Sequence, residues 1–483
     1  MLTALLSFLS LRPRKIVVNF ISRFKASLDS EPDVNSNPYM RQYVPFCLHS
    51  PLLIQTAIYT SACFQGEMGN IESTTAVAHK CRAIEMLTEH LQSRGSTTDE
   101  AIAGVMQLML NEWYWGNTDD LRAHLTGLRE MVRLRGGFGN LGLGGLLARL
   151  VIVSDIAIAL SFEVRPYLQG GPEFDFRDVA RVPFRVFLNT PLVPSLASFS
   201  RCAEALHMHQ ATAQTLDDMR FLIRLVLALP EYPSEKDLQK VQSTSAWIYD
   251  RISNLTAEAP AAQQRHRGSE DQLSPLSADP FGSTALRRSS SGEPPRRASR
   301  HPSPTTPSHT ASIDTASPPG PTVQDTMYQA VRQAALIYAR AIMTRKPLRD
   351  PAVCSQEDFL RLWTTVWRIP LRSWKTVLGV FAWVVLSITP ASRGTPHERF
   401  VKSLLTVGLV QMGMEDWDVT ERAMKGALTL IEWLTGGISG DSAGGHHEEQ
   451  KGRVGGLDSG SFIDPGLFAN GTTTTTGPVT QGW

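Results

Sequence analysis

A long stretch that lacks the means to form a hydrophobic core divides this sequence into two parts. Residues 261–325 contain 10 prolines, many serines and a single aromatic residue, Phe281. Such a composition buries too little apolar surface to offset the entropy that is lost on ordering. We therefore predict a disordered linker rich in serine, proline and arginine over residues 256–325, between helical sequence at residues 16–255 and 326–435.

The two ends of the chain differ from these helical parts. Residues 436–483 hold 13 glycines and a run of five threonines, which predicts a disordered tail. Residues 1–15 begin with an apolar segment that has no basic residues before it and no small-residue cleavage site, so we expect an amphipathic or irregular start and no secretory signal. A peripheral membrane protein anchored through Met1–Leu11 is an alternative. The apolar run at residues 376–389 is too short to cross a bilayer and predicts a buried helix.

Charge and cysteine content exclude several classes of protein. Lysine and arginine number 47 against 46 aspartates and glutamates, for a formal net charge of +1. That balance argues against a protein that binds nucleic acid over its whole surface. The five cysteines lie at least 16 positions apart, which is typical of free intracellular thiols and excludes zinc sites built from C-x-x-C pairs. We predict no metal site and no cofactor.

Apolar residues recur at helical spacing in both parts, with residues that begin and end helices. Thr97-Thr98-Asp99-Glu100 is predicted to be a capping box that opens on Thr97. Asn117 is expected to begin the next helix and Gly136-Gly137 to end it. Residues 182–188 are expected to form an extended loop because of nearby prolines. Further helices are predicted at 355–368 and 374–387, and another is marked by Val77, Cys81, Ile84, Leu87 and Leu91. One face of a last helix is predicted to be lined by Met424, Leu428, Ile431 and Leu434. The fold class is therefore all-α.

Motifs that resemble catalytic or binding sites lack the context that they need. Residues 440–444 match G-x-S-x-G, but they lie in the glycine-rich tail without a preceding strand. Residues 137–142 match G-x-G-x-x-G, but they follow a predicted helix and not a strand. His446-His447-Glu448-Glu449 reads as a solvated polar run. We expect the tryptophan-rich face of Trp363, Trp367, Trp374 and Trp383 to be core packing, with a ligand cavity as the alternative. No catalytic residue is predicted.

The linker carries the clearest local charge bias. Five arginines lie between residues 281 and 301 against one glutamate, and two arginine pairs predict a nuclear import signal: Arg287, Arg288, Arg296 and Arg297. The same region presents serines and threonines suited to basophilic or proline-directed kinases: Ser290, Ser299, Ser303 and Thr306. Phosphorylation would add about −1.5 to −2 charges per site and reverse the sign of this region. A solubilising spacer is the alternative.

An ordered set of motifs runs through the first part. These are residues 37–53 (NPY, YVP and SPLL), 78–87 (AHK, then Ala83, Ile84 and Leu87), 100–113 and 115–137 (W, RAHLTGL and RLRGG), followed by Asp155. They resemble the regulatory domain of fungal-specific transcription factors, which is usually headed by a binuclear zinc cluster. Residues 370–417 resemble the C-terminal helices of the same proteins. The resemblance implies a helical domain that dimerises or responds to small ligands, without agreed catalytic residues. We read His124, Arg133 and Arg135 as packing and capping groups.

The sequence departs from the family in its cysteines. The family's DNA-binding head needs six cysteines, and this sequence has five, with Cys47, Cys63 and Cys81 inside the helical part. We therefore predict a transcription regulator without its own zinc cluster, acting in the nucleus (with the cytoplasm as a second location) through protein partners or self-association. It is not expected to be an enzyme or to contact DNA or membranes. The alternatives are a truncated gene model of a zinc-cluster DNA-binding factor and a helical small-molecule-binding protein, for which an effector would be the ligand.

Overall fold

The computed structural model of the chain describes residues 37–95, 97–178, 183–255 and 322–436. Over these ranges the chain forms helices and no strand, which confirms the prediction of an all-α fold. The N-terminal segment and the tail lie outside the described residues, apart from Gly436. Most of the predicted linker does too, but residues 322–325 form the cap and first turn of a helix.

The helices follow one another without long described connections, except between residues 163 and 198. In the first part they are α3 (Val44–His49), α4 (Pro51–Glu67), α5 (Ser73–Arg94), α6 (Asp99–Trp115), α7 (Thr118–Leu134), α8 (Leu146–Phe162), α9 (Phe199–Cys202), α10 (Gln210–Leu227) and α11 (Glu235–Ser253). In the second part they are α13 (Val323–Thr344), α14 (Gln356–Arg368), α15 (Leu371–Lys375), α16 (Leu378–Ile388), α17 (Glu398–Glu415) and α18 (Trp417–Leu434). Short 3₁₀ or π turns join them, including Val186–Leu188 within the expected extended loop.

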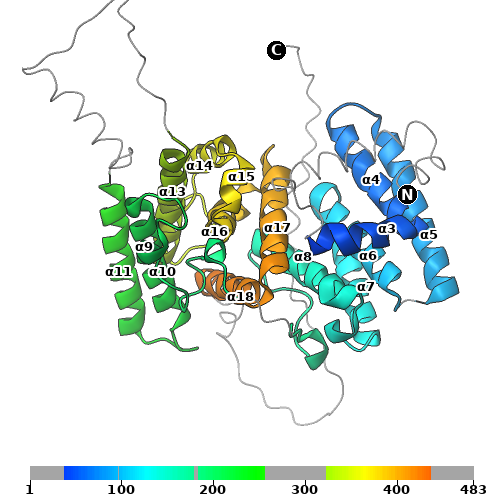
Figure 1. The fold of residues 1–483 in the computed structure, drawn as a ribbon, viewed down its shortest axis with the longest axis horizontal. Coiled ribbons are helices and arrows are strands. Elements are labelled where there is room, and N and C mark those ends of the chain that lie inside the picture. The colour runs from blue at the N-terminus through cyan, green and yellow to red at the C-terminus, as the bar shows by residue number, and fades with distance from the viewer. Residues whose placement is uncertain (1–36, 96, 179–182, 256–321, 437–483) are drawn as a thin grey trace, which may run out of the picture.

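Helices from the two parts of the sequence are interleaved in one elongated body (Figure 1). Helices α3 to α7 form one end, and α9, α10 and α11 with α13 form the other. Between them, α17 of the second part packs against α8 of the first, and α18 packs against α8 and α10. The buried hydrophobic residues of both parts belong to one continuous core. The two parts therefore form a single folding unit.

Two helices are mostly apolar, and other helices of the fold cover them. All 11 residues of α16 are buried, which confirms the buried helix predicted for residues 376–389. The segment Leu143–Phe162 is long and apolar enough to cross a membrane, but two-thirds of its most apolar stretch is buried inside the fold. A helix that is hydrophobic all round and covered by neighbouring helices is a core helix. We therefore assign α8 to the protein interior.

The insert leaves and re-enters the body at one end of an antiparallel helix pair. Arg332 of α13 donates to the backbone oxygens of Ile252 and Ser253, at 3.2 and 2.9 Å, in the last turn of α11. Helix α13 begins nine residues before Arg332, or about 14 Å at 1.5 Å per residue. Residues 256–321 thus join two nearby helix ends and interrupt no packed layer.

Two predictions of helix boundaries differ from the structure. The residue that caps α6 is Thr98 and not Thr97, since the Thr98 hydroxyl accepts from the Ala101 N–H at 3.2 Å. The single helix expected at 374–387 is two helices, because Trp374 turns back and donates to the Val366 oxygen before α16 begins. Asn117, in contrast, caps α7 as predicted.

The helix predicted around Val77 to Leu91 is present as α5, and its apolar residues are only partly buried. Leu87 lies in the core, but Val77 and Ile84 are 58% and 40% exposed, and Cys81 is also exposed. Helix α5 lies at the edge of the body and packs mainly against α4. The small residue Ala83, which is fully buried, forms the close contact. The predicted helix is therefore confirmed, and its position at the edge of the body leaves part of its apolar surface exposed.

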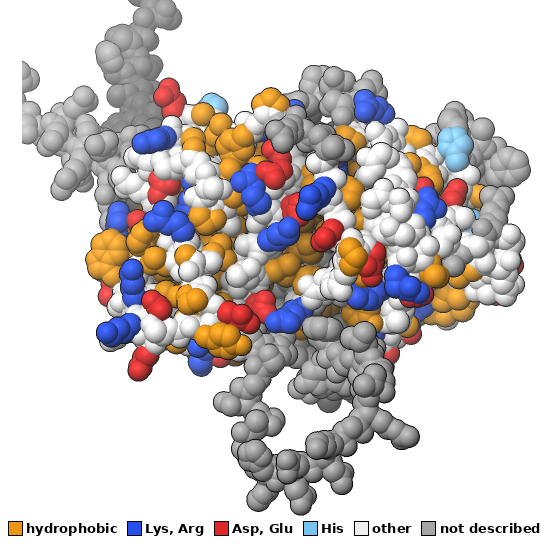
Figure 2. Space-filling view, turned by 90° about the horizontal axis from the view of Figure 1, so that it is seen from below, with side chains coloured by type: hydrophobic (Ala, Val, Ile, Leu, Met, Phe, Trp, Pro, Cys, Tyr) orange, Lys and Arg blue, Asp and Glu red, His pale blue; other side chains and the backbone are white. Residues whose placement is uncertain are grey.

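Charges of both signs are mixed over the surface seen in Figure 2. On this face Lys and Arg side chains alternate with Asp and Glu, and apolar side chains lie between them. Several oppositely charged pairs are neighbours on one helix, such as Arg422 with Asp418 and Lys425 with Glu421. A protein that binds nucleic acid through a basic face presents one sign of charge over it, and this face does not.

Candidate functional site

The motif residues of the first part converge where α5, α6 and α7 meet. The Lys80 ammonium lies 2.9 Å from Oε1 of Glu112 on α6 and 2.9 Å from Oδ2 of Asp120 on α7. The Glu112 side chain has no solvent exposure. Burial alone would lower the pKa of Lys80, but hydrogen bonds and charge from the two carboxylates raise it above its ordinary value. Lys80 is therefore a charged cross-link between three helices.

A second cross-link joins the end of α7 to the start of α6. Arg135 caps α7, and its guanidinium donates to the Thr97 oxygen, to Oδ1 of Asp99 at 3.0 Å and to the Asn140 oxygen at 3.0 Å. The Gly142 N–H donates to the same Asp99 oxygen at 3.2 Å. The sequence predicted a capping role for Arg135 but not its contact with α6.

Arg133 and His124, the two other motif residues on α7, make no cross-link of this kind. Arg133 pairs with the exposed Glu130, with Nη2 and Oε1 2.6 Å apart. His124 is half-buried, and burial lowers its pKa. Neither residue lines the two cavities described below.

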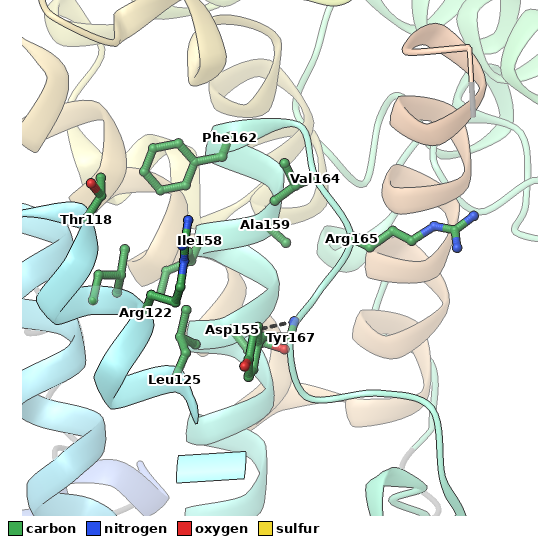
Figure 3. Close-up of a pocket in the computed structure, with 11 residues that line it drawn as sticks. Thr118, Arg122, Leu125, Asp155, Ile158, Ala159, Phe162, Val164, Arg165 and Tyr167 are labelled. Carbon is green, nitrogen blue, oxygen red and sulfur yellow. Dashed lines mark hydrogen bonds between the residues drawn. The ribbon is translucent and has the colours of Figure 1, made fainter. Parts of the chain in front are cut away.

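Asp155 anchors the loop that follows α8 (Figure 3). Its carboxylate accepts from the backbone N–H groups of Tyr167 and Leu168 at 3.0 and 2.8 Å. Burial raises the pKa of Asp155 to about 6. Arg129 of α7 fastens the same loop from the other side, since its Nη1 donates to the oxygens of Tyr167 and Gln169. Asp155 is thus a structural group.

The cavity beside Asp155 is small. It lies between α7, α8 and the loop, it is lined by residues that include Thr118 and Arg122, and it offers about 10 Å³, which is about one water molecule. Figure 3 shows Arg165 pointing away from it toward α18, where its guanidinium pairs with Glu432. A groove of about 190 Å³ lies on that side, between the end of α8 and α18. Both are smaller than the 300–1,000 Å³ that is usual for small-ligand sites.

Buried charges that the sequence did not reveal join the two parts of the chain. Glu163 follows α8 with a φ of 55°, and its carboxylate accepts from the N–H groups of Leu348 and Arg349 at 2.6 and 3.3 Å. Burial raises the pKa of Glu163 to about 7. Lys402 of α17 donates to the Trp113 oxygen at 2.8 Å and pairs with Glu398 at 2.6 Å. Burial lowers the pKa of Lys402.

Three of the four tryptophans of the predicted face are core residues. Trp363, Trp374 and Trp383 are 7%, 1% and 0% exposed, and Trp383 stacks on Tyr338 with the ring centroids 5.0 Å apart. Trp367 differs, since it is 63% exposed. The prediction of core packing is therefore wrong for Trp367, which is on the solvent side of α14. The tryptophans line neither of the two cavities described above.

The G-x-G-x-x-G match at residues 137–142 is explained by the turn that it forms. Residues 137–142 follow α7 and contain a 3₁₀ turn. Gly137 has a φ of 101°, and a Cβ there would lie 2.6 Å from the Glu173 oxygen, so the glycine is required by the turn. Within the described ranges, no three His, Cys, Asp or Glu residues lie close enough to hold a metal ion.

Several predicted residues lie outside the described residues. These are the import arginines Arg287, Arg288, Arg296 and Arg297, the phosphorylation candidates Ser290, Ser299, Ser303 and Thr306, and the tail residues 440–449. They stay predictions.

The geometry defines a class of protein. Its most distinctive polar side chains hold helices together, and the cavities beside them are too small for an ordinary ligand. Such an arrangement is typical of a helical scaffold that is held together by buried polar contacts.

Comparison with known families identifies the scaffold. The family model for the fungal specific transcription factor domain matches residues 18–355, and the chain belongs to this family. The protein is therefore a fungal transcription regulator. The match ends at residue 355, so the resemblance at residues 370–417 stays a prediction. Neither curated proteins nor solved structures give a significant match to the chain.

Proposed function

We propose that this chain regulates transcription in the nucleus through protein–protein contacts of its helical body, and not through catalysis. The observation that carries the proposal is the use of the motif side chains. The polar atoms of Lys80, Arg135 and Asp155 form hydrogen bonds and ion pairs with other helices and loops. Buried polar networks of this kind fix one arrangement of the helices. What such a body offers to other molecules is its outer surface.

Contact with DNA is assigned to something other than these 483 residues. Five dispersed cysteines cannot form the six-cysteine cluster that the family uses. In this proposal the helical body reaches promoters through a partner. The competing hypothesis is a zinc cluster encoded upstream of Met1, which would make this sequence part of a conventional DNA-binding regulator.

Nuclear entry and control are assigned to the insert. Its two arginine pairs, at residues 287–288 and 296–297, would be read by an import receptor. Phosphorylation of Ser290 or Ser299, beside these pairs, would reduce their positive charge. Because residues 256–321 join two nearby helix ends, such a change leaves the core intact.

A reporter experiment tests the proposal. The full chain is fused to a heterologous DNA-binding domain and expressed in yeast that carries the matching promoter. We expect at least a fivefold change in reporter activity, up or down, relative to the DNA-binding domain alone. Replacing Arg287, Arg288, Arg296 and Arg297 with alanine should move a fluorescently tagged chain from the nucleus to the cytoplasm. An unchanged reporter, with stable fusion protein in the nucleus, contradicts the proposed regulation.

Purified protein separates the two hypotheses about DNA. We expect no zinc and no sequence-specific DNA binding from the full chain. Specific binding to a duplex together with two zinc ions per chain would overturn the assignment. A small-molecule effector would appear as a ligand-dependent rise in melting temperature with defined stoichiometry.

A further inference from the structure

An apolar surface lies on the solvent side of α14, α15 and α17. Four large side chains form it, and we call it the Trp367 surface: Leu360, Trp367, Leu371 and Phe400 are 40%, 63%, 42% and 42% exposed. The rings of Trp367 and Phe400 meet edge to face with their centroids 6.1 Å apart, and Trp367 also contacts Trp363 at 5.5 Å. The exposed aromatic rings are therefore continuous across two helices. A contiguous exposed apolar patch marks a binding site more often than a chance exposure.

Two exposed arginines are sequence neighbours of residues that form this surface. Arg368 and Arg372 are exposed and directly follow Trp367 and Leu371 in the sequence. Neither has a hydrogen-bond or ion-pair partner within the described ranges. Other arginines of the same helices are neutralised, as Arg361 is by Glu357 and Arg399 by Glu67. Tryptophan and arginine are the residues most enriched at the centres of protein interfaces. The surface thus suits a peptide with both apolar and acidic side chains.

The chain's own tail contains such a peptide. Residues 457–468 read Leu-Asp-Ser-Gly-Ser-Phe-Ile-Asp-Pro-Gly-Leu-Phe. This segment has two aspartates, no basic residue and five large apolar residues, in contrast to the glycines and threonines around it. Its two aspartates are equal in number to Arg368 and Arg372 and opposite to them in charge. Its phenylalanines Phe462 and Phe468 match the aromatic character of the surface.

The tail is long enough to reach the surface. The described body ends at Gly436, 21 residues before Leu457. Phe400 lies in the first turn of α17, and α18 follows at the other end of α17. That helix has 18 residues, about 27 Å. A random coil of 21 residues has a root-mean-square span of about 25 Å and a maximum of about 70 Å. Helix α18, after which the tail begins, has another 18 residues, again about 27 Å. The start of the tail is therefore at most about 54 Å from the first turn of α17, which is within the maximum span of 21 residues.

We propose that residues 457–468 dock on the Trp367 surface of the same chain and cover it. A short flexible tether gives an effective concentration of about 1 mM. A segment with a Kd of about 100 µM for the free surface would then occupy it about nine-tenths of the time. The docked tail keeps other acidic, aromatic peptides away from the surface until a stronger competitor displaces it. The inference concerns this intramolecular contact and does not require the proposed role in transcription.

A competition experiment tests the docking with full-length protein. The probe is a fluorescein-labelled peptide of residues 455–470, and fluorescence anisotropy measures its binding. In the chain with Phe462→Ala and Phe468→Ala the surface is free, and we expect binding about tenfold tighter than to the unaltered chain, whose tail competes. Adding Trp367→Ala to the double variant should weaken binding at least tenfold. Trp247→Ala is the matched control, because Trp247 is 59% exposed on the distant helix α11, and it should leave binding unchanged.

Each result decides the proposal. Equal affinity for the unaltered chain and the double variant would overturn intramolecular docking, even if Trp367→Ala abolished binding. Binding that survives Trp367→Ala, or is shared by a scrambled peptide, would overturn the assigned surface. A dimer in sedimentation that Trp367→Ala converts to monomer would assign the surface to self-association instead. The reporter experiment is independent of all these readouts, so each proposal can fail without the other.

Discussion

Replacing Lys80 with methionine is expected to destabilise the protein by about 3 kcal/mol, because it leaves a buried carboxylate without its counter-charge. Glu112 has no exposed side-chain surface, and its carboxylate oxygens have no other partner in the described part of the chain. Removing one partner of a fully buried ion pair costs about 3–5 kcal/mol. The lower end applies here, because the Lys80 side chain is 24% exposed and solvent partly screens the pair.

Thermal unfolding followed by circular dichroism measures this effect. About 330 described residues imply an unfolding entropy near 0.7 kcal/mol per kelvin, so a loss of 3 kcal/mol lowers the Tm by about 4 °C. Arg82→Met is the control on the same helix, since Arg82 and Glu85 are both more than half exposed and such a pair contributes less than about 1 kcal/mol. Adding Glu112→Gln to Lys80→Met should restore at least half of the loss. Equal Tm shifts for Lys80→Met and Arg82→Met would refute the reasoning.

Three further predictions concern Lys402, Asp155 and the insert. Lys402→Met should lower the Tm by about 3 °C, because the Trp113 oxygen loses its buried donor, whereas Lys425→Met, on the exposed pair with Glu421, should change it by less than 1 °C. The pKa of Asp155 is about 6 in the folded chain and about 4 in the unfolded chain. The contribution of Asp155 to the free energy of unfolding is therefore complete below pH 4 and falls by about 3 kcal/mol as pH rises to 6. The Tm of the unaltered chain and the Tm of Asp155→Asn, measured against pH, should diverge over this window. Parallel profiles would contradict the raised pKa of Asp155. Replacing residues 258–319 with ten glycines and serines should change the Tm by less than about 2 °C, since loop-closure entropy depends weakly on length; a large loss would show that the insert contributes to the core.

The fold class and most helix positions could be predicted from the sequence because the signals are local. Asn117 caps α7 through the Asp120 N–H three residues away, and the apolar residues of α16 are contiguous. The exposure of single residues, in contrast, depends on how the helices pack. Val77 and Ile84 on α5 have helical spacing, but the edge position of this helix leaves them exposed. A helix with more apolar positions than neighbours cannot bury them all, and the sequence of one helix does not show how many neighbours it has.

The candidate site was less predictable, because its contacts are long-range. His79-Lys80 and the segment around His124 were recognised as motifs, but the ion pair of Lys80 with Glu112 joins residues 32 positions apart. One signal was available: Glu112 interrupts the apolar face formed by Met109 and Trp113, and a carboxylate in such a position needs a buried partner. Glu163 gave no such signal. Its acceptor role depends on backbone N–H groups at Leu348 and Arg349, which lie across the insert.

These long-range contacts explain how the helical body can form a single folding unit although a large insert interrupts its sequence. Glu163 and Lys402 each connect the first part to the second with a buried charge, and Arg332 closes the helix pair beside the insert. The folding unit is therefore closed around residues 256–321 without depending on them. In the proposed function, modification or binding at the insert or the tail changes which partners bind the surface, while the free energy of unfolding of the body stays nearly constant. Such a regulator would be switched at these segments without unfolding its core.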